Sequence, residues 1–281
     1  MNLTPTNPTL ILSDLHLGHR ASQVRDPEQL APLLQEVKTI VLNGDTAELR
    51  HQIDRPVGRG LAATLARICH SSGAKAIFIN GNHDPVISQI DHLDLAEGQL
   101  LVTHGDMLFL GVAPWSRQAY AYRRVHLRAL DQLGPDALRS FEKRLLATKR
   151  TTLKLQLLEE PTTRSRFPAL GLLARQLWPP FRPFMILHAW WETPKLGAKL
   201  LRAFRPNTRY LIIGHTHLPG CWNHGGRVVI NTGSFIFNLG AHAVLLSDKS
   251  FEIRRIDRYQ KKFVLGKRLR EFAISRLQAG S

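Results

Sequence analysis

Residues 9–16 read Thr-Leu-Ile-Leu-Ser-Asp-Leu-His, and this stretch decides the fold class. An apolar run that ends in polar residues is typical of a buried strand followed by a loop. Four later segments repeat this arrangement. The apolar runs are residues 9–13, 39–43, 75–80, 99–103 and 209–213, and the polar blocks are Asp14-Leu15-His16, Gly44-Asp45, Gly81-Asn82-His83-Asp84, His104-Gly105-Asp106 and Gly214-His215-Thr216-His217. The pattern predicts the buried strands of a layered sheet.

The polar blocks share one chemistry. We expect them to gather where the strands end, so that carboxylate, amide and imidazole donors meet at one place. Mixed oxygen and nitrogen donors suit first-row divalent metals such as Mn²⁺, Fe²⁺ or Zn²⁺, whereas Ca²⁺ and Mg²⁺ prefer oxygen alone. Asp, Asn, Gly and His are also common in turns after strands. A turn, however, needs no particular order of ligand types, and therefore the blocks favour a metal site.

The five blocks in this order resemble the calcineurin-like metallophosphoesterases, from about Thr9 to Ser247. The resemblance implies an α/β fold, a β-sandwich flanked by helices in four layers (α/β/β/α), here with a helical insertion. It implies a cofactor of two divalent metal ions, Mn²⁺ first and Fe²⁺ or Zn²⁺ as alternatives, and it implies a phosphoesterase. Two ions about 3.5–4 Å apart need a shared anionic ligand between them.

The family pattern assigns a role to eight residues of the blocks. It marks Asp45 as the bridge between the two ions. Asp14, His16 and His217 would complete the first metal site, and Asn82, His104 and His215 the second. His83 would protonate the leaving oxygen or stabilise the pentacovalent state. Apart from the family pattern, a carboxylate next to a working histidine usually orients its ring, so Asp84 is expected to hold the imidazole of His83. An alternative for Asp84 is an ordinary turn before Pro85.

Charge divides the chain into parts. Of the net charge of +16, residues 115–205 carry +12 and residues 252–281 carry +6, while the remainder carries −2. We therefore predict a nearly neutral core at 1–114 and 206–251 and a basic helical insertion, or lid, at 115–205. Residues 252–281 are predicted to form a final strand and a basic C-terminal helix. Helical patterns in the insertion cover residues 117–131 and 136–159, and a third helix is predicted to begin at Thr193-Pro194.

Apolar and aromatic residues are concentrated in the middle of the insertion, at residues 167–191, beside Arg175 and Arg182. Tryptophan and cations around an apolar strip are typical of helices at a membrane interface. The alternative is that these residues pack the insertion onto the core. Candidate substrate-binding residues are His19, Arg123, Arg124, Trp190 and Trp191.

Three functions follow from these features. In overall plan the chain resembles the UDP-2,3-diacylglucosamine pyrophosphatases, which implies a lipid-linked substrate and an anionic membrane surface as a partner. His83 departs from that family's pattern, which has Arg after Asn, and matches the wider superfamily. The second function is a soluble phosphodiesterase, protein phosphatase or nuclease, the last with nucleic acid bound to the basic insertion. The third is a non-catalytic metal-binding module. The oligomeric state is not predicted.

The sequence also bears on localisation. Cys69 and Cys221 give no disulfide framework, the start of the chain lacks the features of a secretory signal, and no apolar stretch approaches the roughly 20 residues of a membrane-spanning helix. We expect a cytoplasmic protein, with peripheral attachment to the inner membrane if the lipid hypothesis holds.

Overall fold

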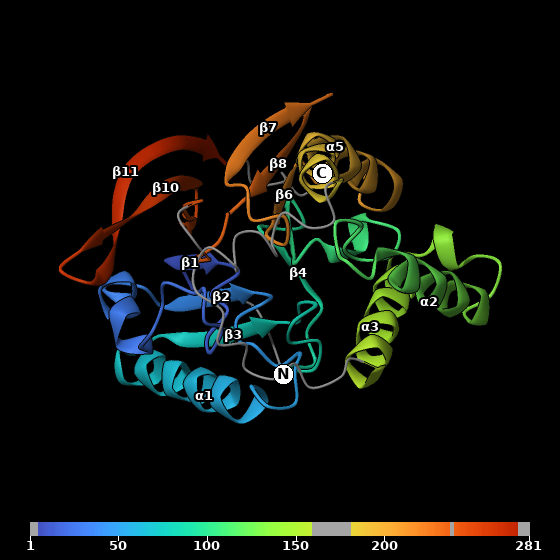
Figure 1. Ribbon diagram of the computed structural model, residues 1–281. Helices are drawn as coiled ribbons and strands as arrows, with labels where there is room; N and C mark the ends of the chain where they lie inside the picture. The colour runs from blue at the N-terminus through green and yellow to red at the C-terminus, as the bar shows by residue number, and fades with distance from the viewer. Residues whose placement is uncertain (1–4, 159–180, 237–238, 275–281) are drawn as a thin grey trace.

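The computed structural model describes residues 5–158, 181–236 and 239–274, and in these ranges two mixed β-sheets lie face to face (Figure 1). The first sheet has the order β11-β10-β9-β1-β2-β3. Strands β1, β2 and β3 are parallel, and β9 runs antiparallel to β1. The bounds are β1 Thr9–Leu12, β2 Thr39–Asn43, β3 Lys75–Ile79, β9 His242–Leu246, β10 Ser250–Tyr259 and β11 Lys262–Ala273.

The second sheet has the order β4-β5-β6-β8-β7. Its three central strands β5, β6 and β8 are parallel, so their carboxyl ends meet at one edge. The bounds are β4 His92–Leu95, β5 Leu100–Thr103, β6 Tyr210–Ile213, β7 Gly220–His224 and β8 Arg227–Asn231. The five predicted apolar runs are therefore the strands β1, β2, β3, β5 and β6.

The side chains of β1 show how the layers are held together. Leu10 and Leu12 pack in the cluster that includes Leu30, Leu33 and Leu65 of the helices on the outer face of the first sheet. Ile11 points the other way and packs between the two sheets. Because successive side chains of a strand face opposite sides, a strand that is apolar throughout must be covered on both faces.

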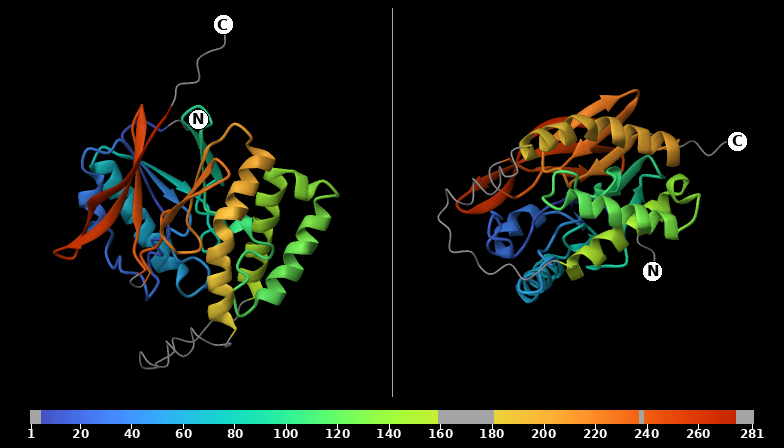
Figure 2. Two further views of the ribbon diagram at one scale, coloured as in Figure 1. Left: turned by 90° about the horizontal axis from the view of Figure 1, so that it is seen from above. Right: turned by 45° about the vertical axis from the view of Figure 1, so that its right-hand side comes forward.

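Helices provide the outer layers. The 3₁₀ helix η1 (Pro27–Leu34) and helix α1 (Arg55–Ser71) cover the first sheet, and α5 (Arg182–Phe204) covers the second. The predicted four-layer α/β/β/α metallophosphoesterase fold is confirmed. The insertion adds α2 (Ala119–Gln132), α3 (Phe141–Leu158) and the 3₁₀ turn η3 (Ala137–Arg139). The 3₁₀ turn η2 (Asp106–Leu108) precedes the insertion. Figure 2 (left) shows α2, α3 and α5 together at the side away from β10 and β11.

One predicted helix start is wrong. Thr193 and Pro194 lie inside α5, which begins at Arg182. A proline within a helix removes one backbone hydrogen bond. Helix α5 nevertheless continues because Ala198 and Leu201 are buried against the second sheet, and the Thr193 hydroxyl donates to the carbonyl of Ala189 at 2.7 Å.

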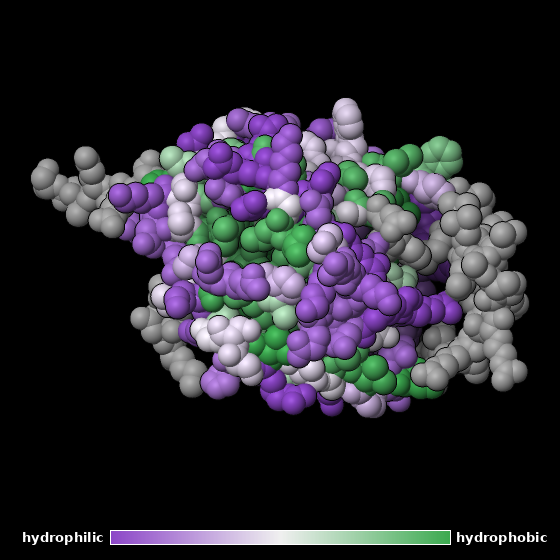
Figure 3. All heavy atoms as spheres, turned by 90° about the vertical axis from the view of Figure 1, so that its left-hand side faces the viewer, coloured by the Kyte–Doolittle hydropathy of each residue, from purple (hydrophilic) through white to green (hydrophobic). Residues whose placement is uncertain are grey.

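The predicted basic C-terminal helix is also wrong. Residues 262–273 form strand β11, which pairs antiparallel with β10 at the edge of the first sheet. The contacts of two aromatic side chains explain why this segment is a strand. Phe263 is buried beside Phe235, and Phe272 stacks on Phe251. Exposed cations such as Lys267 and Arg270 lie on this edge strand, where charge discourages pairing with another chain. Figure 3 shows this side of the molecule as mostly hydrophilic. Residues 275–281 lie outside the described part.

Candidate dinuclear metal centre

The loops after the strands turn sharply at the predicted ligands. Asp14, His16, Asp45, His215 and His217 all have φ between 48° and 66°, a left-handed conformation that is uncommon for residues other than glycine. Gly44, beside Asp45, has a φ of 78°, and a Cβ there would lie 2.4 Å from Nδ1 of His104. Only glycine therefore lets these two loops approach. Such concentrated backbone strain is characteristic of functional sites.

Four of the predicted ligands form the first cluster, in which one donor atom of each lies within 4.8 Å of the others: Asp14, His16, Asp45 and His217. Nε2 of His217 lies 3.1 Å from Oδ1 of Asp14 and 3.3 Å from Nε2 of His16. Nε2 of His16 lies 3.7 Å from a carboxylate oxygen of Asp14 and 3.7 Å from Oδ2 of Asp45. The fold therefore brings together the four residues that were expected to bind the first metal ion.

The second set also adjoins Asp45. Nε2 of His104 is 3.4 Å from Oδ2 of Asp45 and 3.1 Å from Oδ1 of Asn82. The ring centres of His104 and His215 are 5.2 Å apart. Because Oδ2 of Asp45 is close to His16 of the first set and to His104 of the second, it occupies the position expected of a bridging carboxylate.

Hydrogen bonds to the backbone fix the histidine rings. Nδ1 of His104 donates to the carbonyl of Asn43 at 3.1 Å, and Nε2 of His215 donates to the carbonyl of Val112 at 3.0 Å. These backbone bonds leave Nε2 of His104 and Nδ1 of His215 as the ring nitrogens that would bind a metal. Burial disfavours the charged form of His104, but Asp45 outweighs burial and raises the pKa of His104 well above its ordinary value, so a metal would replace the proton on Nε2. Burial, and then the charge of His104, lower the pKa of His215 to about 3, so its imidazole is neutral.

The charge of the site favours cations. Asp14 and Asp45 are buried, and burial by itself would raise the pKa of each carboxyl group. Neighbouring histidines outweigh burial and hold both pKa values below the ordinary range. Two ionised carboxylates, one amide oxygen and four imidazoles form a donor set that fits two first-row divalent ions.

Glu48 is a site residue that the sequence analysis missed. Its carboxylate lies 2.9 and 3.1 Å from Nδ1 of His83, and its side chain is 2% exposed. Burial disfavours the imidazolium of His83, but Glu48 and then Asp45 outweigh burial and raise the pKa of His83 to about 9. The sequence offered one indication that Glu48 belongs to the site, namely its position three residues after Asp45 in the same loop.

Asp84 does not hold His83, contrary to the predicted catalytic role. Its carboxylate accepts hydrogen bonds from the backbone N–H groups of Gly81, Asp45, Thr46 and Ala47, at 2.7 to 3.1 Å. A short acidic side chain that is buried between two loops readily accepts hydrogen bonds from nearby backbone N–H groups. The alternative interpretation as a turn residue is the better one, and Asp84 shapes the loop that carries Asp45.

The predicted substrate-binding residues are dispersed. The ring of His19 is 6.1 Å from that of His16, and burial lowers the pKa of His19 to about 4. Arg123 and Arg124 are exposed on α2. Nε1 of Trp190 donates to the carbonyl of Thr216 at 2.8 Å, between two metal ligands, whereas Trp191 is 70% exposed. Trp190 thus anchors α5 to the metal-binding loop, and Trp191 faces outward.

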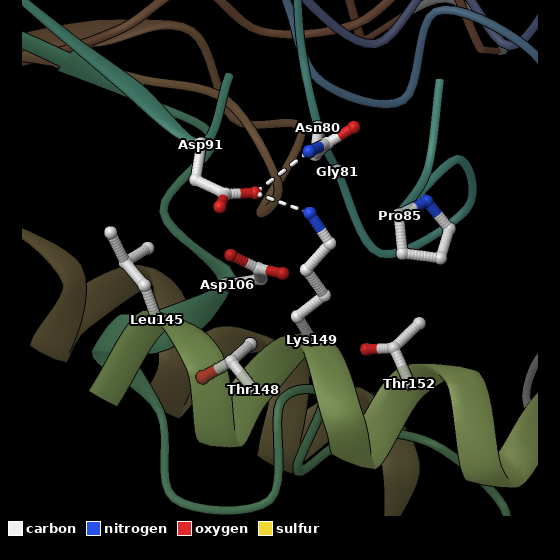
Figure 4. A pocket seen from close by; sticks show the side chains of 9 residues that line it. All are labelled: Asn80, Gly81, Pro85, Asp91, Asp106, Leu145, Thr148, Lys149 and Thr152. Carbon is white, nitrogen blue, oxygen red and sulfur yellow. Dashed lines mark hydrogen bonds and ion pairs between the residues drawn. The ribbon is translucent and has the colours of Figure 1, made fainter. Parts of the chain in front are cut away.

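A small pocket lies between helix α3 and the loops that carry Asn80, Asp91 and Asp106 (Figure 4). Nζ of Lys149, on α3, lies 3.1 Å from Oδ1 of Asp91, and the same oxygen accepts from Nδ2 of Asn80 at 2.7 Å. Nε2 of Gln156 also donates to the carbonyl of Asn82 at 3.4 Å. Helix α3 is therefore fastened to the loop that carries Asn82.

Together, the fold and the seven clustered donors define a metal-dependent phosphoester hydrolase. The calcineurin-like phosphoesterase family model matches residues 8–219, and the chain belongs to that family. No curated protein matches this chain.

The solved structures to which the chain is similar are remote. A dimetal phosphatase from Danio rerio is 12% identical with a TM-score of 0.45, covering 96% of this chain and 99% of its own. Wild-type Vps29 from Entamoeba histolytica, complexed with Zn²⁺, is 13% identical with a TM-score of 0.40, covering 95% and 99%. A predicted phosphoesterase from Streptococcus pneumoniae TIGR4 is 14% identical with a TM-score of 0.36, covering 94% and 96%. The family assignment rests on the family model and the motifs.

Within the described ranges, none of the helices combines the length and the apolar character needed to cross a bilayer.

Proposed function

We propose that this enzyme hydrolyses a lipid-linked phosphodiester or pyrophosphate, such as UDP-2,3-diacylglucosamine, at an anionic membrane surface. The observation that carries the proposal is an apolar stripe on α5. Phe184, Leu187 and Trp191 are 72%, 56% and 70% exposed. Their spacing of three and four residues places them on one face of the helix.

The stripe is connected to the metal centre. Trp190, next to Trp191, donates its indole N–H to Thr216, between His215 and His217. Nζ of Lys195 lies 5.0 Å from the ring centre of Trp191, so a cation accompanies the aromatic end of the stripe. Exposed apolar rings beside cations suit acyl chains below anionic headgroups.

The residues of the site have separable tasks in this reaction. Asp14, His16, Asp45 and His217 would hold one ion, and Asp45, Asn82, His104 and His215 the other. Two bound divalent ions neutralise charge on the phosphoryl group and lower the pKa of water. Nε2 of His83 faces this region, 3.9 Å from Oδ2 of Asp45, and its proton is available for the leaving oxygen.

A comparison of substrates tests the proposal. Phe184→Ser with Trp191→Ser should lower hydrolysis of UDP-2,3-diacylglucosamine in mixed micelles at least tenfold, because several exposed apolar groups lose contact with the acyl chains. Hydrolysis of the soluble diester bis(p-nitrophenyl) phosphate should stay within twofold. Tyr120→Ser is the matched control, because Tyr120 is an aromatic residue 75% exposed on α2.

Two outcomes would overturn the lipid proposal. One is wild-type enzyme that cleaves the soluble diester but not the lipid nucleotide. The other is equal loss on both substrates in the double variant. Retention on single-stranded nucleic acid together with cleavage of it would instead favour the nuclease.

A further inference from the structure

His126, in the insertion, contacts the loop that precedes it. Its side chain lies on α2, is 4% exposed, and accepts a hydrogen bond at Nδ1 from the backbone N–H of Gly111 at 3.1 Å. Burial, and then the charge of Arg144, lower the pKa of His126 to about 4. The ring is therefore neutral at physiological pH, and the lone pair on Nδ1 accepts the hydrogen bond from Gly111.

The loop held by His126 has a strained backbone. Gly111 has a φ of 87° and Val112 a φ of 65°, which is rare for a β-branched residue. A Cβ on Gly111 would lie 3.0 Å from Cα of Arg123, so α2 is packed directly on this turn. The buried side chain of Val112 packs with Tyr122 of α2 and Leu155 of α3. Strain of this kind persists only where the surroundings hold it.

The strained residue contacts the metal centre. The carbonyl of Val112 accepts the hydrogen bond from Nε2 of His215 at 3.0 Å. This bond fixes the orientation of the His215 ring, whose centre lies 5.2 Å from that of His104 in the second metal set. A continuous series of contacts thus joins α2 to a metal ligand: His126 to Gly111, Gly111 to its neighbour Val112, and Val112 to His215.

We propose that His126 is a positioning residue for the metal ligand His215, through which the insertion sets the affinity of the second metal site. Outer contacts that orient a metal-binding histidine typically change metal affinity or activity 10- to 100-fold. The proposal rests on the dinuclear centre and is independent of whether the substrate carries a lipid.

Metal binding in three variants tests this role. Titration of apoprotein with Mn²⁺ in a calorimeter should show the second ion bound about tenfold more weakly in His126→Leu, and the first ion within twofold of wild type. His126→Asn keeps an acceptor near the position of Nδ1 and should restore the second affinity. Leu127→Ala, exposed on the same helix, is the matched control and should change neither. Wild-type affinities in a folded His126→Leu protein would overturn the proposal, as would equal weakening of both ions.

A measurement on the unaltered protein covers the case in which His126→Leu does not fold. Binding and loop order are linked, so each must affect the other reciprocally. Mn²⁺ should slow hydrogen exchange at the Gly111 amide several-fold. The amide of Gly73, bonded to His70 at the end of α1, should not change. An unaffected Gly111 amide would contradict the coupling.

Discussion

The carboxylate of Glu48 contacts the imidazole of His83, with Oε2 of Glu48 2.9 Å from Nδ1 of His83. Burial raises the pKa of Glu48, but His83 and then His16 outweigh burial and lower it to about 2, so the carboxylate is ionised. An ionised partner at Nδ1 holds the ring and stabilises the imidazolium form of His83, which carries a proton on Nε2 as well.

Glu48→Gln should lower kcat about 10- to 100-fold, the range for loss of a group that orients a working histidine. The amide keeps a hydrogen-bond acceptor but removes the charge, so both metals should remain. Steady-state kinetics with elemental analysis checks this. Glu142→Gln, at an exposed position, is the control. If metal content fell in proportion to kcat, the role of Glu48 would be to maintain metal binding and not to orient His83.

His83→Asn should lower kcat by roughly 10²–10⁴-fold with both metals retained, because acid–base assistance to the leaving group is lost. A substrate with a good leaving group, such as a nitrophenyl ester, should suffer less than an alkyl ester. Loss of metal in this variant would show that His83 is a ligand, and equal losses on the two esters would exclude a role in protonation.

Asp84→Ala should destabilise the fold more than it alters chemistry. The change leaves four backbone donors without their acceptor, and each buried unsatisfied group costs about 1–3 kcal/mol. Urea unfolding should show a loss of more than about 3 kcal/mol. Asp136→Ala removes an exposed aspartate and should leave the urea midpoint nearly unchanged. Equal midpoints for the two variants would show that Asp84 is not needed to hold the loops.

The titration of His126 should lower the free energy of unfolding in mild acid. Its pKa is lowered from 6.5 to about 4 in the folded chain. Between these values the unfolded chain binds a proton that the folded chain does not, so stability falls as the pH falls, by up to about 1.4 kcal/mol per pH unit. His126→Asn does not titrate and should show a shallower pH dependence of the urea midpoint. Parallel curves for the two proteins would contradict this assignment.

The fold and the ligands were predictable for the same physical reason. Strand β1 is apolar at every position from Leu10 to Leu12, and only a strand covered on both faces needs that composition. The ligands follow such strands directly, so their convergence at the strand ends required no knowledge of distant contacts.

The errors lie where tertiary contacts decide. The basic composition of the run from Lys262 to Ala273 predicts a helix, but pairing with β10 and the stacking of Phe272 on Phe251 make it a strand. Glu48 and Asp84 are both acidic loop residues near the site, and only the three-dimensional arrangement shows which one contacts His83.

The most direct test of the account is the metal content of active protein, measured by elemental analysis alongside activity as Mn²⁺ is returned to metal-free enzyme. Activity should appear only as the second ion binds, and the plateau should correspond to two ions per chain. Asp45→Ala should neither bind two ions nor become active, because it lacks the bridge between the two sites. Full activity with one ion or none per chain, or an Asp45→Ala enzyme that binds two ions and hydrolyses phosphoesters normally, would contradict the dinuclear mechanism.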